Sequence, residues 1–318
     1  MRAVRVHEFG VPPVIEEVPD PVAGEGRSVV RVEAATVGHI DRTIWGGAFL
    51  RHPPLPYTPG VEAAGVVVAG DAFPSGTRVW IRGGGLGTAT DGTWSELASV
   101  PDASMGLLPD EVPFTVGSAF FSPSTSAWVS LHEVGGLRAG ERVVVTGATG
   151  AVGSMACQLA LEMGASVAAI VSSPDRLPLI TPGAQPILLE RGASASEGLV
   201  ADLLIDTVGG GVLATLLPCV VGDGRVVLVG YLAGHELQLD LPSFIQRDVS
   251  LLPLNMIRRE PAGRAAAPEL LARLASGQLR LDVTTFALDD AAAAMEWLSA
   301  AGHQGRAVLL PQPPKGPR

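Results

Sequence analysis

Apolar and polar positions follow two different patterns along this chain, and the change comes near Pro113. Before it, short runs alternate between apolar and polar residues, which is typical of half-buried strands, and turns rich in Gly and Pro separate them. Such a series of short strands without long helices predicts a partly open β-barrel. The strands predicted here span residues 1–6, 29–35, 61–69, 77–81 and 93–100, and a short helix begins within 38–47.

After Pro113 the spacing becomes helical, and the helical segments alternate with apolar strands. This alternation predicts a doubly wound parallel sheet, so the expected fold class is α/β, with a β-barrel domain and a Rossmann domain. The predicted helices span residues 114–121, 126–134, 154–163, 267–276 and 289–301. The predicted strands span residues 142–145, 166–171, 186–189, 201–206, 225–229, 249–254 and 306–310.

The last two helices and the last strand are expected to rejoin the first domain. The barrel domain should therefore comprise residues 1–118 and 258–318, and the Rossmann domain residues 119–257. Prolines at 178, 182 and 186 interrupt the stretch between Arg176 and Ala201, so one helix is expected to be lost there or reduced to a turn.

The stretch Val143–Gly153, VVVTGATGAVG, is an apolar strand followed by glycines at every third position. A helical segment from Ser154 and a second apolar strand complete a βαβ unit, an arrangement that can bind a dinucleotide. The pyrophosphate is expected on the free amides at the start of this helix, although the glycines could merely form a tight turn. The candidate cofactor residues of this turn are Gly147, Ala148, Thr149, Gly150, Ala151, Val152 and Gly153.

Composition narrows the class of protein. The 318 residues are 47% apolar and 17% charged, which is typical of a globular chain, and the formal net charge of −10 argues against a nucleic-acid partner. Two cysteines cannot form a disulfide framework. The N-terminal residues lack the apolar segment of a signal peptide, and no apolar run is long enough to span a bilayer. We expect a cytoplasmic protein with a small-molecule substrate and no membrane partner.

The order of several segments resembles that of the medium-chain dehydrogenase/reductase superfamily over nearly the whole chain. The matching segments are VEAATVGHIDRTIWGG, PGVEAAGVV, LRAGERVVVTGATGAVG, LIDTVGG and GRVVLVG. The resemblance implies a GroES-like barrel at the N-terminus, a Rossmann domain inserted after it, and a C-terminal return to the barrel.

Departures from the zinc alcohol dehydrogenases indicate the branch. Gly38 stands where those enzymes place a cysteine ligand, and Val61 stands where a histidine would precede Glu62. Neither side chain can bind zinc, and residues 82–100 hold no cysteines for a structural zinc. The chain is therefore most similar to the zinc-independent quinone oxidoreductase branch, which reduces quinones and activated alkenes, and no metal is expected. We treat Glu62 and Asp41 as structural.

The end of the second Rossmann strand, VAAIVSSPDR, bears on the choice of cofactor. Ser172 and Ser173 replace the acid that usually accepts from the ribose 2′-hydroxyl of NAD, and Arg176 follows them. Two hydroxyls and a guanidinium suit a 2′-phosphate, so NADPH is expected. Alternatively, Ser173 caps a helix and Arg176 is a surface charge, and Asp175 could compete with phosphate for Arg176.

Other cofactor candidates follow from the resemblance, and each has a plain structural alternative. Val208 lies in a turn expected near the cofactor, and Gly230 and Tyr231 end the following strand, where Tyr231 could instead be a half-buried aromatic residue. Thr125 could hydrogen-bond the nicotinamide or its ribose, or else cap a helix. Asn255 is expected at the nicotinamide end of the site, or else is a loop residue.

The catalytic candidates are His39 and Tyr57, because the polar residues common in this branch are replaced by Gly38 and Phe49. A lone histidine is often structural, and Tyr57 stands among prolines. Trp45, Phe49, Trp94 and the loop 82–94 are expected to line an apolar pocket for a flat substrate, or else to pack as ordinary core.

The sequence therefore predicts an NADPH-dependent, zinc-independent reductase of quinones or activated alkenes. Two alternatives stay open: a pathway-specific enoyl reductase that acts on one elaborate substrate, and a non-enzymatic NADPH-binding protein. A homodimer is expected, because the apolar strand 249–254 would otherwise leave an unprotected sheet edge.

Overall fold

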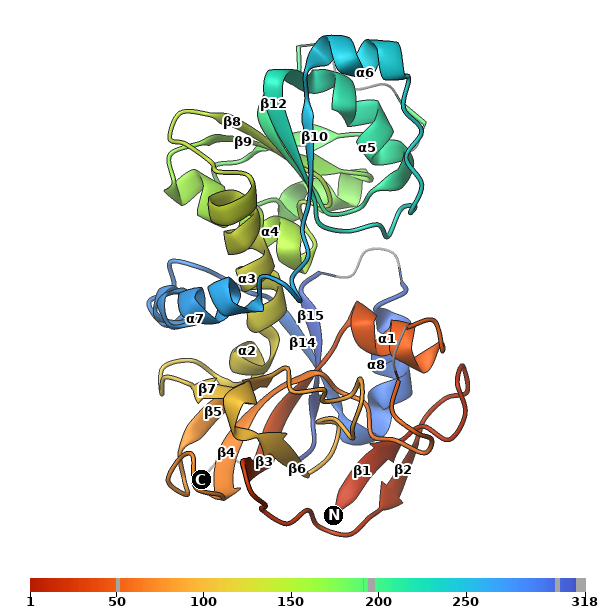
Figure 1. The fold of residues 1–318 in the computed structure, drawn as a ribbon, viewed down its shortest axis with the longest axis vertical. Coiled ribbons are helices and arrows are strands. Elements are labelled where there is room, and N and C mark those ends of the chain that lie inside the picture. Colours follow the sequence, from red (N-terminus) through yellow and green to blue (C-terminus); the bar gives the residue numbers. More distant parts are fainter. Residues whose placement is uncertain (50–51, 191, 194–197, 301–303, 313–318) are drawn as a thin grey trace. The chain divides into compact units, whose positions relative to one another are not determined.

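The computed structural model describes residues 1–49, 52–190, 192–193, 198–300 and 304–312 (Figure 1). The chain divides into two compact units. The first comprises Met1–Phe121, Leu274–Ser276 and Leu281–Arg318, and the second comprises Ser122–Arg273 and Gly277–Arg280. The mixed α/β class is as predicted, with one barrel-like unit and one unit built on a parallel sheet.

The first unit is organised around β3 (Arg27–Val37), a long strand whose side chains are mostly buried. Its first half pairs with β6 and its end pairs with β15, while β4 lies along its other side; all three partners are antiparallel to it. The strand order is β14-β15-β3-β4-β5-β7, and β1 and β2 form a separate hairpin. The other strands of this unit are β1 (Arg2–Arg5), β2 (Val14–Glu17), β4 (Glu62–Ala69), β5 (Arg78–Arg82), β6 (Leu97–Pro101), β7 (Met105–Leu107), β14 (Val283–Ala287) and β15 (Arg306–Leu310).

Short helices complete the first unit. They are α1 (His39–Trp45), α2 (Phe114–Ala119) and α8 (Ala291–Trp297), with 3-10 turns at Asp102–Ser104 and Leu288–Asp290. Residues of α8 pack with the inner faces of β3, β4 and β15 in one apolar core that includes the fully buried Trp94. The predicted strands of this unit are found with shifts of at most two residues at each end, except that the predicted strand 93–100 begins four residues later, as β6. Strands β7 and β14 were not predicted, because β7 has only three residues and β14 has no buried position that would give an apolar strand pattern.

The second unit contains six parallel strands in the order β10-β9-β8-β11-β12-β13. The order reverses direction between β8 and β11, which is the place where doubly wound sheets bind ligands. The strands are β8 (Arg142–Val145), β9 (Ser166–Val171), β10 (Gln185–Leu188), β11 (Ala201–Asp206), β12 (Val220–Leu228) and β13 (Ser250–Pro253). They lie within one residue of the predicted spans, except that β12 begins five residues earlier than predicted. The helices are α3 (Phe121–Val129), continued by a π-helix (Ser130–Val134), α4 (Ala151–Glu162), α5 (Gly210–Leu216), α6 (Leu241–Arg247) and α7 (Glu260–Ala275).

The connection from β9 to β11 is short, as predicted. A 3-10 segment, Pro174–Leu179, follows β9, and Pro178 lies inside it. The described residues between this segment and β11 contain strand β10 and turns, with no α-helix. The lost helix matters for the site below, because loops rather than a helix border the sheet at this end.

The expected domain boundary at residue 258 differs from the structure. Residues 258–273, including most of α7, fall in the second unit and not with the barrel. Helix α7 packs closely on α3, since a Cβ at Gly263 would lie 3.0 Å from Cβ of Thr125. Arg273 Nη1 also donates to Glu162 Oε2 of α4 at 2.7 Å. These contacts hold α7 to the helices of the parallel sheet.

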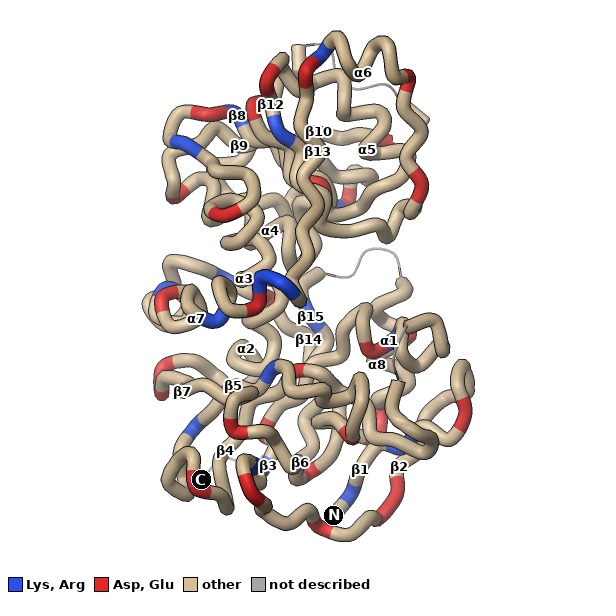
Figure 2. The backbone as a smooth tube through the Cα atoms, viewed as in Figure 1, with Lys and Arg blue, Asp and Glu red and all other residues tan. Residues whose placement is uncertain are grey.

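Charged residues are spread over both units, with acidic and basic positions intermixed (Figure 2). Among the residues that the structure describes, no helix combines the length and the apolar composition that crossing a bilayer requires.

Candidate functional site

The two central strands of the parallel sheet, β8 and β11, end in turns that are hydrogen-bonded to each other. Thr146 Oγ1 donates to Asp206 Oδ1 at 2.7 Å, and Thr207 Oγ1 donates to the carbonyl of Thr146 at 2.7 Å. Asp206 Oδ2 accepts from the amide of Gly209 at 2.9 Å. Burial raises the pKa of Asp206, and these hydrogen bonds offset part of the rise. Asp206 therefore serves the turns, which are thereby fixed at the switch point of the sheet.

The glycine-rich turn after β8 differs from the prediction in where its helix begins. Helix α4 starts at Ala151, three residues before the predicted start at Ser154, with Gly150 as its N-cap. The amides at the helix start thus belong to Ala151, Val152 and Gly153. This shift was hidden because a Gly-Ala-Val-Gly segment has weak helical propensity and reads as part of the turn.

Two of the glycines are required by close approach of the backbone. Gly147 has φ of +57°, and a Cβ there would lie 2.5 Å from Thr207 Oγ1. A Cβ at Gly153 would lie 2.2 Å from the carbonyl oxygen of Gly147. Gly153, predicted to bind cofactor, is thus buried in the first turn of α4, where it seats the helix on the turn.

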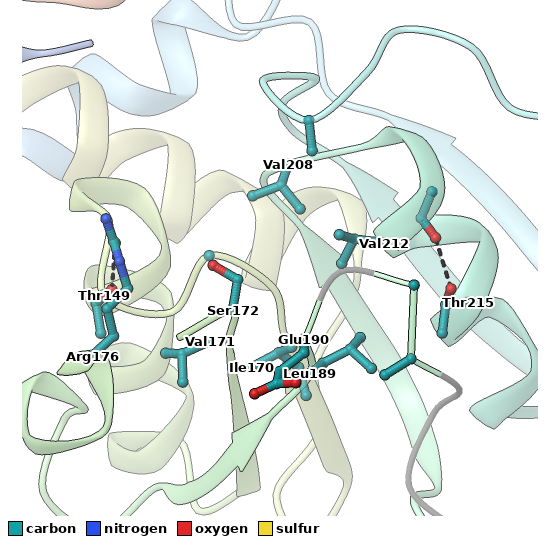
Figure 3. A pocket seen from close by; sticks show the side chains of 15 residues that line it. Thr149, Ile170, Val171, Ser172, Arg176, Leu189, Glu190, Val208, Val212 and Thr215 are labelled. Atoms are coloured by element: carbon teal, nitrogen blue, oxygen red, sulfur yellow. Dashed lines mark hydrogen bonds between the residues drawn. The ribbon is translucent and has the colours of Figure 1, made fainter. Parts of the chain in front are cut away.

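A cavity of about 580 Å³ opens at the carboxyl ends of β9, β10 and β11 in the second unit (Figure 3). Its size lies in the range typical of small-molecule sites. Much of its lining is aliphatic, with polar groups at separate places. Five predicted cofactor residues line it: Gly147, Thr149, Ser172, Arg176 and Val208.

Arg176 lies across the glycine-rich turn. Its Nη1 donates to Thr149 Oγ1 at 3.0 Å, and Figure 3 shows the two side chains together at one end of the cavity. The pKa of Asp175, the possible competitor for Arg176, is lowered mainly by the neighbouring Ser173 hydroxyl and also by the charge of Arg176. Ser173 is not among the residues that line the cavity, whereas Ser172 is.

The remaining cofactor candidates are not among the residues that line this cavity. Thr125 is fully buried within α3, near Gly263, so it does not cap a helix. Asn255 is exposed, and its Oδ1 accepts from the amides of Ile257 and Arg258 at 3.0 and 3.2 Å. Tyr231 is 71% exposed rather than half-buried. Gly230 lies close to the turn after β11, since a Cβ there would lie 2.2 Å from the carbonyl oxygen of Thr207. Ala148 is buried behind the turn.

Sequence reasoning missed the far side of the cavity. Most of the predicted cofactor residues follow β8, β9, β11 and β12, whereas the end of β10 lies beside that of β9 and contributes as many lining residues. Because parallel strands bring their carboxyl ends to one edge, the residues after the predicted strand 186–189 could have been named. The missed lining residues are Ile170, Val171, Leu189, Glu190, Gly192, Ala193, Gly211, Val212, Thr215 and Ala233.

The first unit holds a buried cluster of charges beside Gly38. Arg306 Nη2 donates to Glu62 Oε2 at 2.5 Å, and Arg82 Nε lies 3.5 Å from Glu62 Oε1. Asp41 Oδ2 accepts from the amide of Gly38 at 2.8 Å. Burial raises the pKa of Asp41 to about 7, because little but that amide stabilises its charge directly. A Cβ at Gly38 would lie 3.6 Å from Arg306 Nη2.

Several known proteins resemble this chain along most of its length. Residues 24–110 match the alcohol dehydrogenase GroES-like domain, and residues 183–309 match the family described as zinc-binding dehydrogenase. The quinone oxidoreductase of Homo sapiens is 31% identical over 245 residues, which cover 72% of this chain and 73% of that protein. The chain belongs to the quinone oxidoreductase branch of the medium-chain dehydrogenase/reductase superfamily.

Solved structures from this branch share the fold. The quinone oxidoreductase of Pseudomonas syringae pv. Tomato DC3000 gives a TM-score of 0.86 at 27% identity, covering 98% of this chain and 99% of that one. The quinone oxidoreductase of Thermus thermophilus, also solved in complex with NADPH, gives a TM-score of 0.78 at 28% identity, covering 98% and 100%. The predicted family and fold class are confirmed, and the chain is an oxidoreductase of this superfamily.

The two predicted catalytic residues, His39 and Tyr57, both lie in the first unit. His39 is the first residue of α1 and is half-buried, and its carbonyl accepts from Thr43 Oγ1 at 2.9 Å. Tyr57 is 1% exposed and packs in an apolar cluster with Val6, Ile44 and Val61. A proton donor must reach the reacting molecule, so the burial of Tyr57 argues against the predicted role.

The aromatic residues predicted to line a substrate pocket are found in two settings. Trp94 is fully buried, and its Nε1 donates to the carbonyl of Thr36 at 2.9 Å, as expected of core packing. Trp45 and Phe49 pack against the Tyr57 cluster. Among the described residues, no three His, Cys, Asp or Glu side chains gather closely enough to hold a metal ion.

Proposed function

We propose that this chain is an NADPH-dependent, zinc-independent reductase that transfers a hydride to a quinone or an activated alkene, such as an enone or enoyl substrate. The observation that carries the proposal is the presence of Arg176 and Ser172 in a nucleotide-sized cavity, at the strand end where NAD enzymes place an acid. Relatives named quinone oxidoreductases, one of them solved with NADPH, support it.

The residues present suit the cofactor. Free amides at the start of α4 and the glycine-rich turn can take the pyrophosphate, and the aliphatic lining can take the flat base. The guanidinium of Arg176 can exchange its bond to the neutral Thr149 hydroxyl for stronger bonds to a 2′-phosphate. NADPH supplies the hydride when bound, and the chain contributes binding, orientation and exclusion of water.

Replacing Arg176 tests the choice of cofactor. Arg176→Ala should raise the Kd for NADPH roughly 10- to 100-fold, because a charge-assisted hydrogen bond is lost, and should change the Kd for NADH little. Isothermal titration calorimetry measures both. Arg138→Ala, an exposed arginine before β8, is the matched control and should change neither. Equal losses for NADPH and NADH in Arg176→Ala would exclude the 2′-phosphate assignment.

A second candidate, a non-enzymatic NADPH-binding protein, is favoured by the lack of obvious proton donors. Gly38 and Phe49 replace polar residues of the branch, and Tyr57 is buried. NADPH consumption against 1,4-benzoquinone, simple enones and enoyl thioesters distinguishes the candidates. Turnover of quinones and simple enones supports the proposal, turnover of enoyl thioesters alone supports the pathway-specific reductase, and tight binding without turnover supports the binding protein.

We propose further that two copies associate through β13. This strand forms one edge of the parallel sheet, as its sequence predicts, and it is apolar at Leu251 and Leu252. Unpaired backbone groups on an apolar edge favour association with another strand, and a two-fold axis would pair β13 with itself.

A further inference from the structure

The cavity of the second unit carries two opposite charges at separate places. Arg176 lies at one end with Thr149, and Glu190 is the one carboxylate among the described lining residues. Figure 3 shows Glu190 near Leu189 and Ile170, apart from the Arg176 side chain. Arg176 and Glu190 form no ion pair with each other in the part of the chain that the structure describes. The two charges are thus available to different parts of one ligand.

The order of strands gives the order of these positions. The glycine-rich turn follows β8, Ser172 follows β9, and Glu190 follows β10, and these three strands are neighbours in that order. Leu188 is paired with Val171, and the amide of Leu189 bonds to the carbonyl of Val171 at 2.8 Å. Strands lie about 4.8 Å apart, so Glu190 stands roughly 10 Å across the sheet from the glycine-rich turn.

The walls between these positions suit a flat base. Ile170 and Leu189 lie on the strand side of the cavity, and Val208 and Val212 come from the turn after β11 and from α5. Aliphatic walls can bury the two faces of a purine, but the polar groups along its edge still require hydrogen-bond partners. Among the described side chains that line the cavity, Glu190 carries the one carboxylate and is therefore the strongest acceptor for that edge.

We infer that Glu190 recognises adenine by accepting a hydrogen bond from its exocyclic amine. This inference rests on the proposed function and adds a base-reading residue to it. Adenine presents a donor at this position, whereas hypoxanthine presents a carbonyl oxygen, which a carboxylate repels. Glu190 therefore selects the base, while Arg176 selects the 2′-phosphate.

The competing role for Glu190 is electrostatic. If the Glu190 carboxylate lay beside the 2′-phosphate, its charge would lower the affinity for NADPH relative to that for NADH. Removing this charge would then improve NADPH binding. The two roles predict changes in different ratios of dissociation constants, so one set of titrations separates them.

The experiment titrates NADPH, NADH and the hypoxanthine analogue of NADPH into the wild-type chain and Glu190→Gln by calorimetry. The wild-type chain should bind NADPH roughly tenfold more tightly than the hypoxanthine analogue, because a hydrogen bond to a charged group is replaced by repulsion. In Glu190→Gln the amide can turn either its oxygen or its nitrogen to the base, so that preference should fall to about twofold or less. The ratio of the dissociation constants for NADPH and NADH should be the same in Glu190→Gln as in the wild-type chain.

Two controls complete the design. Glu236→Gln, an exposed acid of the same unit outside the cavity lining, should change neither ratio. Arg176→Ala should change the NADPH-to-NADH ratio and leave the base preference intact. Equal binding of both bases by the wild-type chain, or a Glu190→Gln variant that gains affinity for NADPH over NADH, would overturn the inference. Failure of every dinucleotide to bind would overturn the proposed function itself.

Discussion

Two buried carboxylates of the first unit, Asp41 and Glu62, are held in opposite ways. Glu62 lies between two guanidinium groups, those of Arg306 and Arg82, so its charge is compensated although it is 1% exposed. Asp41 is 2% exposed, and one of its oxygens has no hydrogen-bond partner among the described residues. Burying a charge without such partners costs free energy, and the group responds by holding its proton.

Stability should therefore depend on pH through Asp41. Its pKa is about 7 in the folded chain and near 3.8 when unfolded, so the folded state holds the proton more tightly. The contribution is fully present below about pH 4 and is lost as the pH rises to about 7, by at most about 1.4 kcal/mol per pH unit. Asp41→Asn cannot ionise and should lack this loss.

Urea unfolding of the wild-type chain and of Asp41→Asn at pH 5 and pH 8 measures the effect. The free energy of unfolding of Asp41→Asn, relative to the wild-type chain, should be higher at pH 8 than at pH 5. Asp91→Asn, at an acid that is 62% exposed in its pair with Arg5, is the control and should show a much smaller dependence over this range. A constant difference between Asp41→Asn and the wild-type chain would contradict the raised pKa.

At the scale of elements, the strands of the parallel sheet could be predicted because apolar β-branched runs are bounded by Gly and Pro. The helices were harder, since their ends depend on packing. Helix α7 begins at Glu260, seven residues before its predicted start, although Pro261, Gly263 and Pro268 disfavour a helix. Because Gly263 has no side chain, α3 can pack closely against α7 at this position. The stabilisation that this packing provides cannot be read from the local sequence.

In the candidate site, too, the residues of local sequence signatures could be predicted, whereas those placed by tertiary structure could not. Residues that follow a glycine-rich signature, such as Gly147 and Thr149, could be named from the sequence, and so could Ser172 and Arg176 at the end of the next strand. Glu190 follows the predicted strand 186–189 directly, but its place in this cavity depends on β10 lying beside β9, which only the folded sheet shows. The prolines around Tyr57 predicted a loop, but they gave no sign that its backbone pairs with Val6 and that its ring is buried.

The seating of α4 on the glycine-rich turn gives a prediction for Gly153. Gly153→Ala should lower the free energy of unfolding by about 1–3 kcal/mol, because the new methyl group would collide with the carbonyl of Gly147. It should also weaken NADPH binding, since the turn must shift. Urea unfolding and calorimetry measure the two effects.

Gly211→Ala is the matched control for Gly153→Ala. Gly211 lies in the first turn of α5, and a Cβ there would meet nothing within 4 Å. The free energy of unfolding of Gly211→Ala should equal that of the wild-type chain or be slightly higher, because alanine has a higher helix propensity than glycine. An equal loss of stability in both variants would show that the close approach at Gly153 is not the cause.

At the scale of the whole molecule, the exposed edge of the parallel sheet predicts how the chain associates. Leu252→Lys on β13 should convert the proposed dimer into a monomer, because a lysine on an edge strand opposes pairing and two would meet across the axis. Sedimentation equilibrium measures the mass. Leu107→Lys is the control, because β7 ends the other sheet and Leu107 is 62% exposed. A wild-type monomer, or dissociation by Leu107→Lys as well, would exclude association through β13.

Strand β15 has a further consequence, for the time at which the first unit can form. The end of β3 finds its partner on one side only in β15, some 270 residues later, and Arg306 of β15 also neutralises Glu62. The second unit ends at Arg280, so its residues are synthesised before β15 is made. Until then the nascent barrel has an open strand edge and a carboxylate whose main cation has not yet been made. Synthesis of β15 therefore closes this edge of the sheet and supplies the cation of Glu62 together, and a chain that stops before Arg306 can do neither.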